Sequence, residues 1–362
     1  MALKSVLVLT AAFGEGHNAA ARNLAAALEE KGVAVEVHDL FAEVYGPANR
    51  FVRSLYLLVI NHAPLLWSAA FFILDRTEVV AMGIGIFGRA ARLLAKTISR
   101  MQPDVIVSTY PGNGYLLDVI RRRNEAGAAR MVTVVTDSLT VNSVWFRCRS
   151  DFFLVPNEAT AAAMRAAGVP AGKIRVTGFP VPLVFAEPAP PRDGEVFEVL
   201  FMVNSAHHLA ADVVQALVEI EGIYLTVTVG HEAGLDRRIE NIARAAGKTV
   251  EVHGWTPEIP TLIRRSHLLI SKAGGATVQE ALAARTPMII TQIVPGQEEG
   301  NARLLIESGA GELATTPAAI AEAVRGTFAD GGRLYRERLA ATGPLSHPDA
   351  ARKAAAFLES LA

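Results

Sequence analysis

The strongest constraint on the fold is an apolar run that ends in a glycine turn. The run Leu268–Ile270 is followed directly by Ser271–Gly275, and apolar residues then recur at helical spacing. This order predicts a strand, a turn and a helix, the repeating unit of an α/β fold. The N–H groups at the start of such a helix have no partner within it, and the helix dipole reinforces them. We therefore predict an anion site that suits a phosphate.

Polar residues beyond this turn are suited to the rest of a nucleotide. Glu280 falls about two turns into the predicted helix, where its carboxylate can accept hydrogen bonds from a pair of vicinal hydroxyls. A second strand at 288–291 leads through a proline–glycine loop to the polar cluster 297–301, which opens another helix. Polar side chains in that position bind ligands in open α/β sheets. A ribose diphosphate would use both segments.

Length and composition limit the other possibilities. A chain of 362 residues is predicted to form two domains, because single cores stop growing at roughly 250–300 residues. Hydrophobic residues make up 51% and aromatic residues 7%, which suits α/β layers built from aliphatic side chains. A formal net charge of −1 gives no whole-chain argument for nucleic-acid binding. With Cys148 as the only cysteine, an internal disulfide framework is excluded and an intracellular chain is expected.

The N-terminal segment predicts a first strand and a glycine loop. Lys4 is followed by a short apolar run and then by this loop, not by a cleavage site, so no signal peptide is expected. Gly14 and Gly16 lack the third glycine of a dinucleotide fingerprint, which argues against NAD. His17 follows at the start of a predicted helix, where it could serve as a capping residue.

The segment 49–100 combines apolar residues with cations. Its apolar run 55–74 approaches the roughly 20 residues of a membrane-spanning helix. Three residues interrupt the run and predict two short helices in place of a span: Asn61, His62 and Pro64. Apolar residues interleaved with arginines suit helices that lie in an anionic membrane surface. A solvated face on ordinary core helices would have the same composition.

Several motifs, taken in order, resemble one family. Three motifs are similar to the donor half of the glycosyltransferases that make monogalactosyl- and glucosyl-diacylglycerol. They are KAGG-T-QEA from Lys272, P-GQEEGN from Pro295 and SGAG from Ser308. The N-acetylglucosaminyltransferase of peptidoglycan synthesis is a relative with a similar pattern. GxGH from Gly14 resembles the acceptor-side loop of the diacylglycerol enzymes. The resemblance implies a GT-B fold, in which two Rossmann-like domains face each other across a cleft.

The expected domains follow from this resemblance. Residues 1–180 would form the acceptor and membrane domain, and a proline-rich linker would occupy 181–195. Residues 196–345 would bind the UDP-sugar. A final helix in 346–362 would pack back on the first domain.

The resemblance also implies a reaction and its residues. A hexose would move with inversion from UDP-glucose or UDP-galactose to diacylglycerol or a similar lipid, at the cytoplasmic face of a membrane to which the protein binds peripherally. His17 would take the acceptor proton, and Asp137, which follows a buried strand, would assist it or bind the acceptor; a helix-capping role for Asp137 stays open. Residues on the acceptor and membrane side are Gly14, Gly16, Arg89 and Arg92. Residues expected at the UDP-sugar are Ser205, Gly230, His231, Gly254, Trp255, Ser271, Lys272, Ala273, Gly274, Gly275, Thr277, Glu280, Gln297, Glu298 and Asn301.

One loop departs from the family pattern. Residues 204–208 read Asn-Ser-Ala-His-His where the family places a glycine-rich turn, and close approach to a diphosphate is harder without glycine. Adjacent histidines do not face one centre, so no metal is expected. No cofactor is expected either, because the UDP-sugar would be a co-substrate. Two alternatives remain at this point: a UDP-sugar transferase or epimerase with a soluble substrate, and a non-catalytic sugar-nucleotide-binding protein associated with membranes.

Overall fold

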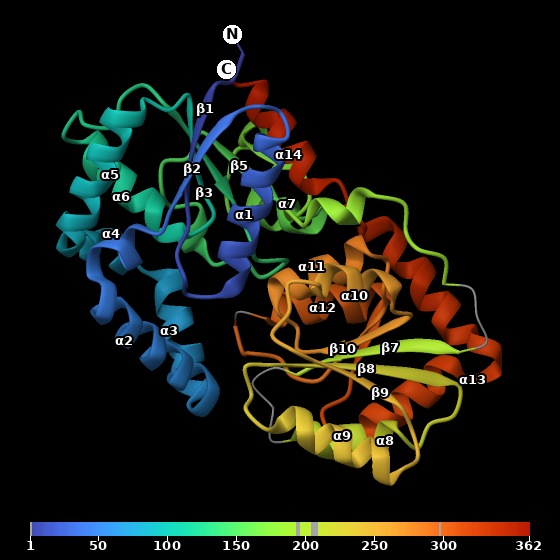
Figure 1. Cartoon of the computed structure of the whole chain (residues 1–362). Coiled ribbons are helices and arrows are strands. Elements are labelled where there is room, and N and C mark those ends of the chain that lie inside the picture. Colours follow the sequence, from blue (N-terminus) through green and yellow to red (C-terminus); the bar gives the residue numbers. More distant parts are fainter. Residues whose placement is uncertain (1, 193–195, 204–208, 297) are drawn as a thin grey trace. The chain divides into compact units, whose positions relative to one another are not determined.

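The protein contains two α/β units, each built on a parallel sheet (Figure 1). The computed structural model describes residues 2–192, 196–203, 209–296 and 298–362. The first unit comprises Met1–Leu183, Val294–Gly300 and Asp349–Ala362, and the second comprises Val184–Ile293 and Asn301–Pro348. The α/β class expected from the sequence is confirmed.

The sheet of the first unit has the order β2-β1-β3-β4-β5-β6. Its strands are β1 Ser5–Leu9, β2 Ala34–His38, β3 Val105–Ser108, β4 Arg130–Val134, β5 Phe152–Val155 and β6 Ile174–Val176. All neighbouring pairs are parallel. The chain leaves β1 for β2 on one side and later returns to β3 on the other side. The order of the strands therefore reverses at β1 and β3, which is where such sheets bind ligands.

Helices cover both faces of this sheet, and the alternation of side chains along β1 explains how. Val6 and Val8 pack in one apolar cluster with α1 (Glu15–Glu29) and α14 (Ala350–Glu359). Leu7 and Leu9 pack in another with α5 (Gly88–Met101) and α6 (Pro111–Arg121). Successive side chains of a strand point to opposite faces of the sheet. A strand that is apolar throughout therefore needs helices packed on both faces. Helix α7 (Glu158–Ala166) covers the far end of the sheet.

The C-terminal helix is part of the first unit. Helix α14 lies against α1, and two ion pairs join the ends of the chain. Lys31 Nζ lies 2.6 Å from Glu359 Oε2, and Arg352 Nε lies 3.0 Å from Glu30 Oε2. The apolar contact comes from alanines and Leu358 on the inner face of α14.

Between β2 and β3 the chain forms several helices that extend away from the sheet: α2 Leu40–His62, α3 Pro64–Arg76, α4 Val79–Gly83 and the 3₁₀ helix η1 Ile84–Phe87. Pro64 is the first residue of α3 and separates it from α2, because proline cannot donate to the preceding turn. The expected break of the apolar run into two helices is confirmed, because α2 ends at His62 and α3 begins at Pro64. Helix α2 begins earlier than the apolar run, at Leu40, and its backbone is non-helical at Gly46. Within the described ranges, no helix has the length and hydropathy needed to cross a bilayer.

The sheet of the second unit has the order β12-β11-β10-β7-β8-β9, and all neighbours are parallel. Its strands are β7 Phe197–Met202, β8 Ile223–Gly230, β9 Val250–Gly254, β10 Leu268–Ser271, β11 Met288–Ile290 and β12 Gly311–Leu313. The order of the strands reverses between β7 and β10. The turn after β10 therefore lies at the ligand-binding position of a Rossmann sheet.

Two layers of helices cover this second sheet. Figure 1 shows α10, α11 and α12 on one face and α8 and α9 on the other. Their bounds are α8 Ala210–Leu217, α9 Leu235–Ala245, α10 Ile259–Arg265, α11 Gly275–Ala283 and α12 Glu299–Ser308. The segment α13, Pro317–Thr342, is helical on both sides of a non-helical stretch at Ala329–Gly332. Its first part packs with α8 over the apolar residues of β7 and β8.

The edge strand of this sheet begins at a glycine. Gly311–Leu313 forms the strand β12, which pairs with β11. A Cβ at Gly311 would collide with the backbone carbonyl of Met288, so the close pairing of β11 with β12 requires a glycine. A segment of three residues is too short for periodicity to distinguish a strand from a helix.

Candidate active site

His17 lies where the order of strands in the first sheet reverses. Helix α1 begins two residues before it, and Gly14 occupies the capping position, so the reading of His17 as the helix cap is wrong. The imidazole is buried, and its Nδ1 lies 3.1 Å from Thr136 Oγ1. The hydroxyl of Thr109, directly after β3, donates to the His17 carbonyl at 3.0 Å. Two loops therefore fix this side chain.

The environment of His17 keeps its imidazole neutral. Burial lowers its pKa to about 4, and a hydrogen bond with the Thr109 backbone opposes that shift only in part. The rings of Tyr110 and Trp145 lie with their centroids 5.3 Å and 5.7 Å from the imidazole centroid. A neutral imidazole can accept a proton at neutral pH, which a charged one cannot.

Asp137 follows β4 and is held by an indole. Trp145 Nε1 donates to Asp137 Oδ2 at 2.7 Å, and no helix starts at Asp137, so the capping alternative is wrong. Burial raises the pKa of this carboxyl to about 6, while the bond from Trp145 opposes the shift. The carboxyl is therefore ionised at pH 7 and becomes protonated in mildly acidic solution.

His17 and Asp137 line the same cavity, which has a volume of about 310 Å³. The rest of its wall is mainly apolar and aromatic, and it comes from α2, α3 and the loops after β1, β3 and β4. The principal side chains are Phe13, Val52, Tyr56, Trp67, Phe71, Leu74, Tyr110 and Trp145. Such a cavity can hold an apolar ligand and direct one polar group towards the two titratable residues.

The sequence did not indicate several residues that surround His17. Thr136, Tyr110 and Trp145 contact His17, and each belongs to a different segment from it. The only sequence signal was the pair formed by Thr136 and Asp137 at the end of an apolar strand. Trp145 reaches Asp137 from eight residues along the chain through a loop without periodicity, so no local pattern could indicate the contact.

The remaining residues expected on the acceptor side lie at different places in the first unit. Gly14 precedes α1 and Gly16 lies in its first turn. Arg89 and Arg92 are exposed on α5, whose opposite face is buried in the core. The arginines do not line the cavity that contains His17.

The turn after β10 has the geometry expected of an anion site. Gly274 is the capping residue and α11 begins at Gly275, so the N–H groups of the first helical turn point towards the carboxyl edge of the sheet. Asn301 Nδ2 donates to the carbonyl of Ala273 at 3.1 Å and holds the turn from α12. Ser271 and Lys272 form the end of β10 and the start of the turn.

Two further residues lie along α11. Thr277 lies in its first turn and Glu280 in its second, and both are half-buried. Their positions allow contact with groups attached to a phosphate at the helix start. The second unit therefore brings together Ser271, Lys272, Ala273, Gly274, Gly275, Thr277, Glu280 and Asn301.

His231 and Trp255 form a separate pair at the carboxyl ends of β8 and β9. Their rings stack with centroids 6.0 Å apart, and the strands end side by side at Gly230 and Gly254. Trp255 is 67% exposed, which excludes a core role. Strand β9 lies three positions from β10, which is about 14 Å at a spacing of roughly 4.8 Å per strand. The pair is therefore not part of the turn at β10.

Of the remaining residues expected at the UDP-sugar, one makes a structural hydrogen bond and two are outside the described residues. Glu298, in the segment assigned to the first unit, is buried, and its carboxylate accepts the Val294 N–H at 3.0 Å. Ser205 and Gln297 lie outside the described residues, as does the unusual loop 204–208. In the part of the chain that is described, no cluster of three or more His, Cys, Asp or Glu side chains could hold a metal ion.

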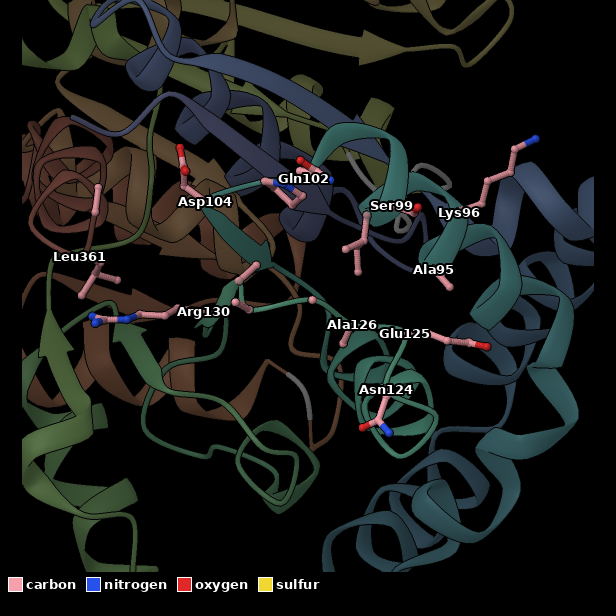
Figure 2. A pocket seen from close by; sticks show the side chains of 16 residues that line it. Ala95, Lys96, Ser99, Gln102, Asp104, Asn124, Glu125, Ala126, Arg130 and Leu361 are labelled. Atoms are coloured by element: carbon pink, nitrogen blue, oxygen red, sulfur yellow. The ribbon is translucent and has the colours of Figure 1, made fainter. Parts of the chain in front are cut away.

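A larger hollow of about 880 Å³ lies at the opposite edge of the first sheet (Figure 2). It is open, and it borders the amino ends of β3 and β4 together with the last residues of the chain. Asp104 in its wall accepts the backbone N–H groups of Lys4 and Ser5, at 2.8 Å and 2.9 Å, and so holds the chain into β1. Its size therefore does not make it the better candidate, because ligands of parallel sheets bind at the carboxyl edge.

Comparison with known proteins gives matches over both units. Residues 17–181 match the family described as monogalactosyldiacylglycerol (MGDG) synthase, and residues 199–330 match glycosyl transferases group 1. A processive diacylglycerol beta-glucosyltransferase of Bacillus cytotoxicus is 25% identical, with 96% of this chain and 91% of the relative covered. An enzyme of the same name from Bacillus cereus is 26% identical, with 84% and 80% covered.

Solved structures share the fold at low identity. MurG of Acinetobacter baumannii has a TM-score of 0.64 at 15% identity and covers 99% of both chains. The glycotransferase of kitacinnamycin has a TM-score of 0.64 at 13% identity, covering 99% of this chain and 98% of that one. The UDP-GlcNAc 2-epimerase of Neisseria meningitidis, bound to UDP-GlcNAc, has a TM-score of 0.61 at 12% identity, covering 97% and 98%. The expected GT-B type of fold is confirmed.

Proposed function

We propose that this chain, which belongs to the monogalactosyldiacylglycerol synthase and processive diacylglycerol glucosyltransferase family of glycosyltransferases, transfers a hexose from a UDP-sugar to diacylglycerol or a similar lipid. The observation that carries the proposal is the cavity at His17 and Asp137. Its wall is apolar and aromatic, as a lipid requires, yet it contains a neutral imidazole and a carboxyl. A lipid hydroxyl in this cavity would meet both groups.

The proposed reaction is a direct displacement. The oxygen of the lipid hydroxyl attacks the anomeric carbon of the donor, and the bond from that carbon to the diphosphate oxygen breaks. His17 accepts the hydroxyl proton, and UDP leaves with the electron pair of the broken bond. Because the attack comes from the side opposite the leaving group, the configuration at the anomeric carbon is inverted. Ionised Asp137, in the same cavity wall, favours the imidazolium that forms on His17.

The donor would bind to the second unit through its diphosphate. The N–H groups at the start of α11 and the helix dipole would bind the diphosphate, and Glu280 would accept hydrogen bonds from the ribose. The same groups would stabilise the charge that develops on the leaving UDP. We propose that no metal is needed for this step. The exposed ring of Trp255 would lie near the uracil.

The protein would reach its acceptor by binding peripherally to the cytoplasmic face of a membrane. Among the described side chains, ten large apolar ones between residues 51 and 86 are at least two-fifths exposed, compared with five in the rest of the described chain. The ten are Phe51, Val52, Leu55, Leu58, Leu66, Phe72, Ile73, Val79, Met82 and Ile86. Exposed apolar groups of this kind are expected at a membrane contact, and the arginines of α5 would add attraction to anionic lipid.

A transfer assay with purified protein tests the proposal. Liposomes containing diacylglycerol are incubated with labelled UDP-glucose or UDP-galactose, and lipid-soluble label is measured. We expect a glycolipid with a β linkage from one α-linked donor, with the anomer assigned by NMR, and equal yield with and without EDTA. Release or epimerisation of the sugar without lipid would instead support the soluble-substrate alternative. Absence of lipid-soluble label with either donor would contradict the proposal.

A further inference from the structure

The end of helix α3 is tied to the segment 142–147 by several hydrogen bonds. Ser143 N donates to Asp75 Oδ1 at 2.7 Å, and the Ser143 hydroxyl donates to the Asp75 carbonyl. Asn142 Nδ2 donates to the carbonyl of Phe71 at 3.1 Å, and Arg147 Nη1 to that of Thr77 at 2.8 Å. Asn142 and Ser143 are both buried. The two segments therefore hold each other in place.

The same segment carries the indole that holds Asp137. Asn142 caps the short 3₁₀ helix η2, Ser143–Trp145, by accepting the N–H of Val144 at 3.1 Å. Trp145 is 2% exposed, donates to Asp137, and lies against the His17 ring. A chain of contacts thus runs from Asp75 through Ser143 and Trp145 to Asp137.

Helix α3 also has two different apolar faces. Trp67, Phe71 and Leu74 line the cavity that contains His17 and Asp137. Leu66 and Ile73, which lie seven residues apart on the helix, are 61% and 52% exposed. One helix therefore forms both a wall of the cavity and part of the exposed apolar surface. Its position affects the shape of the site.

An ordinary helix end does not explain Asp75. The residue is in the last turn of α3, where the negative end of the helix dipole disfavours a carboxylate. The side chain gains its hydrogen bond from Ser143, not from its own helix. The hydrogen bond of this carboxylate therefore holds the segment 142–147.

We propose that Asp75 is a positioning residue for the transfer reaction. Its carboxylate holds the turn that presents Trp145, and through Trp145 it sets the place of Asp137 beside the acceptor. The inference rests on the proposed function, because it assigns Asp137 a role in transfer. Asp75 itself does not line the cavity and touches no reacting atom.

The test compares three variants with the parent protein. Asp75→Ala leaves the buried Ser143 N–H without its acceptor, and we expect kcat to fall by about 10- to 100-fold, the range expected for small misplacement in a site. The KM for the UDP-sugar should not change, because the donor turn is built from residues of the second unit. Asp75→Asn keeps an oxygen that can accept this N–H and should restore most of kcat.

Asp104→Ala is the matched control for a purely structural effect. Asp104 is also an aspartate of the first unit whose carboxylate accepts backbone N–H groups, but it lies at the amino edge of the sheet. Circular dichroism and urea unfolding of each variant give the fraction of folded protein, to which every kcat is normalised. If Asp75→Ala does not fold, Asp75→Glu keeps the charge but displaces it by one methylene, and kcat should still fall.

The possible results distinguish failure of the proposed function from failure of the role proposed for Asp75. A parent protein without transfer to lipid contradicts the proposed function itself. If the parent is active, the inference is overturned when the normalised kcat of Asp75→Ala lies within twofold of the parent value. The same criterion applies to Asp75→Glu if Asp75→Ala does not fold. An equal loss of kcat in Asp104→Ala would overturn it as well, because the effect would then be general destabilisation.

Discussion

The indole of Trp145 donates from Nε1 to Asp137 Oδ2 at 2.7 Å, and the same indole lies against the imidazole of His17. One buried side chain thus joins the two titratable residues of the cavity. The bond fixes one carboxylate oxygen of Asp137 and favours the ionised form, against the effect of burial. This arrangement leads directly to predictions about pH.

The rate of transfer should fall as the pH is lowered through about 6. Burial raises the pKa of Asp137 to about 6, so the carboxylate takes up a proton in this range. His17, with a pKa lowered to about 4, stays neutral from pH 5 to 8 and adds no limb there. The measurement is kcat/KM against pH for the parent and for Asp137→Asn, which should lack the limb. A limb near pH 6 that persists in the variant would assign it to another group.

The stability of the same variant should depend on pH in a defined way. The folded state holds the Asp137 proton more tightly than the unfolded state, so its contribution to stability is present below about pH 4 and is lost as the pH rises to about 6. Asp137→Asn removes that loss. The free energy of unfolding of the variant minus that of the parent should therefore increase from pH 4 to 6 and then stay level. Urea unfolding at each pH measures it, and a flat difference contradicts the raised pKa.

Replacing His17 should affect chemistry more than donor binding. His17→Ala removes the proposed proton acceptor, and turnover should fall about 10²- to 10⁴-fold, the usual contribution of one general base. UDP affinity should be nearly unchanged, because His17 belongs to the first unit and the donor turn to the second. Turnover equal to that of the parent removes His17 from the mechanism, and loss of the fold would indicate a structural role.

Replacing Glu280 should weaken donor binding. A carboxylate bound to the ribose makes charge-assisted bonds worth roughly 1.5–3 kcal/mol, so Glu280→Ala should raise the Kd for UDP by about 10- to 150-fold. Glu240→Ala, on the exposed face of α9 in the same unit, is the control and should leave the Kd unchanged. Calorimetry with UDP measures both, and an unchanged Kd in Glu280→Ala contradicts the ribose assignment.

Binding to membranes should depend on the arginines of α5. The protein should sediment with liposomes that contain anionic lipid, and salt should release part of it, because charges are screened over about 10 Å at 0.1 M salt. Reversing both charges with Arg89→Glu and Arg92→Glu should weaken sedimentation and leave UDP affinity unchanged. Arg237→Glu with Arg238→Glu, exposed on α9 of the second unit, is the matched control. Equal binding to neutral and anionic liposomes would contradict the electrostatic contribution.

The sequence determined the elements that depend on neighbouring residues. The turn Ser271–Gly275 and helix α11 follow from an apolar run, two glycines and helical spacing, all within sixteen residues. The loop before His17 was evident for the same reason. Such patterns are local because hydrogen bonds in turns and helices join residues close in the chain.

Tertiary structure alone decided the surroundings of the candidate base. His17 meets Thr136 across 119 positions of the chain, and α3 reaches the segment of Trp145 across 68 positions at Asp75 and Ser143. No periodicity encodes these pairs, because they depend on how β1, β3 and β4 align in one sheet and on where the helices between them pack. The pKa values of His17 and Asp137 depend on the same packing, since burial is the main cause of both shifts.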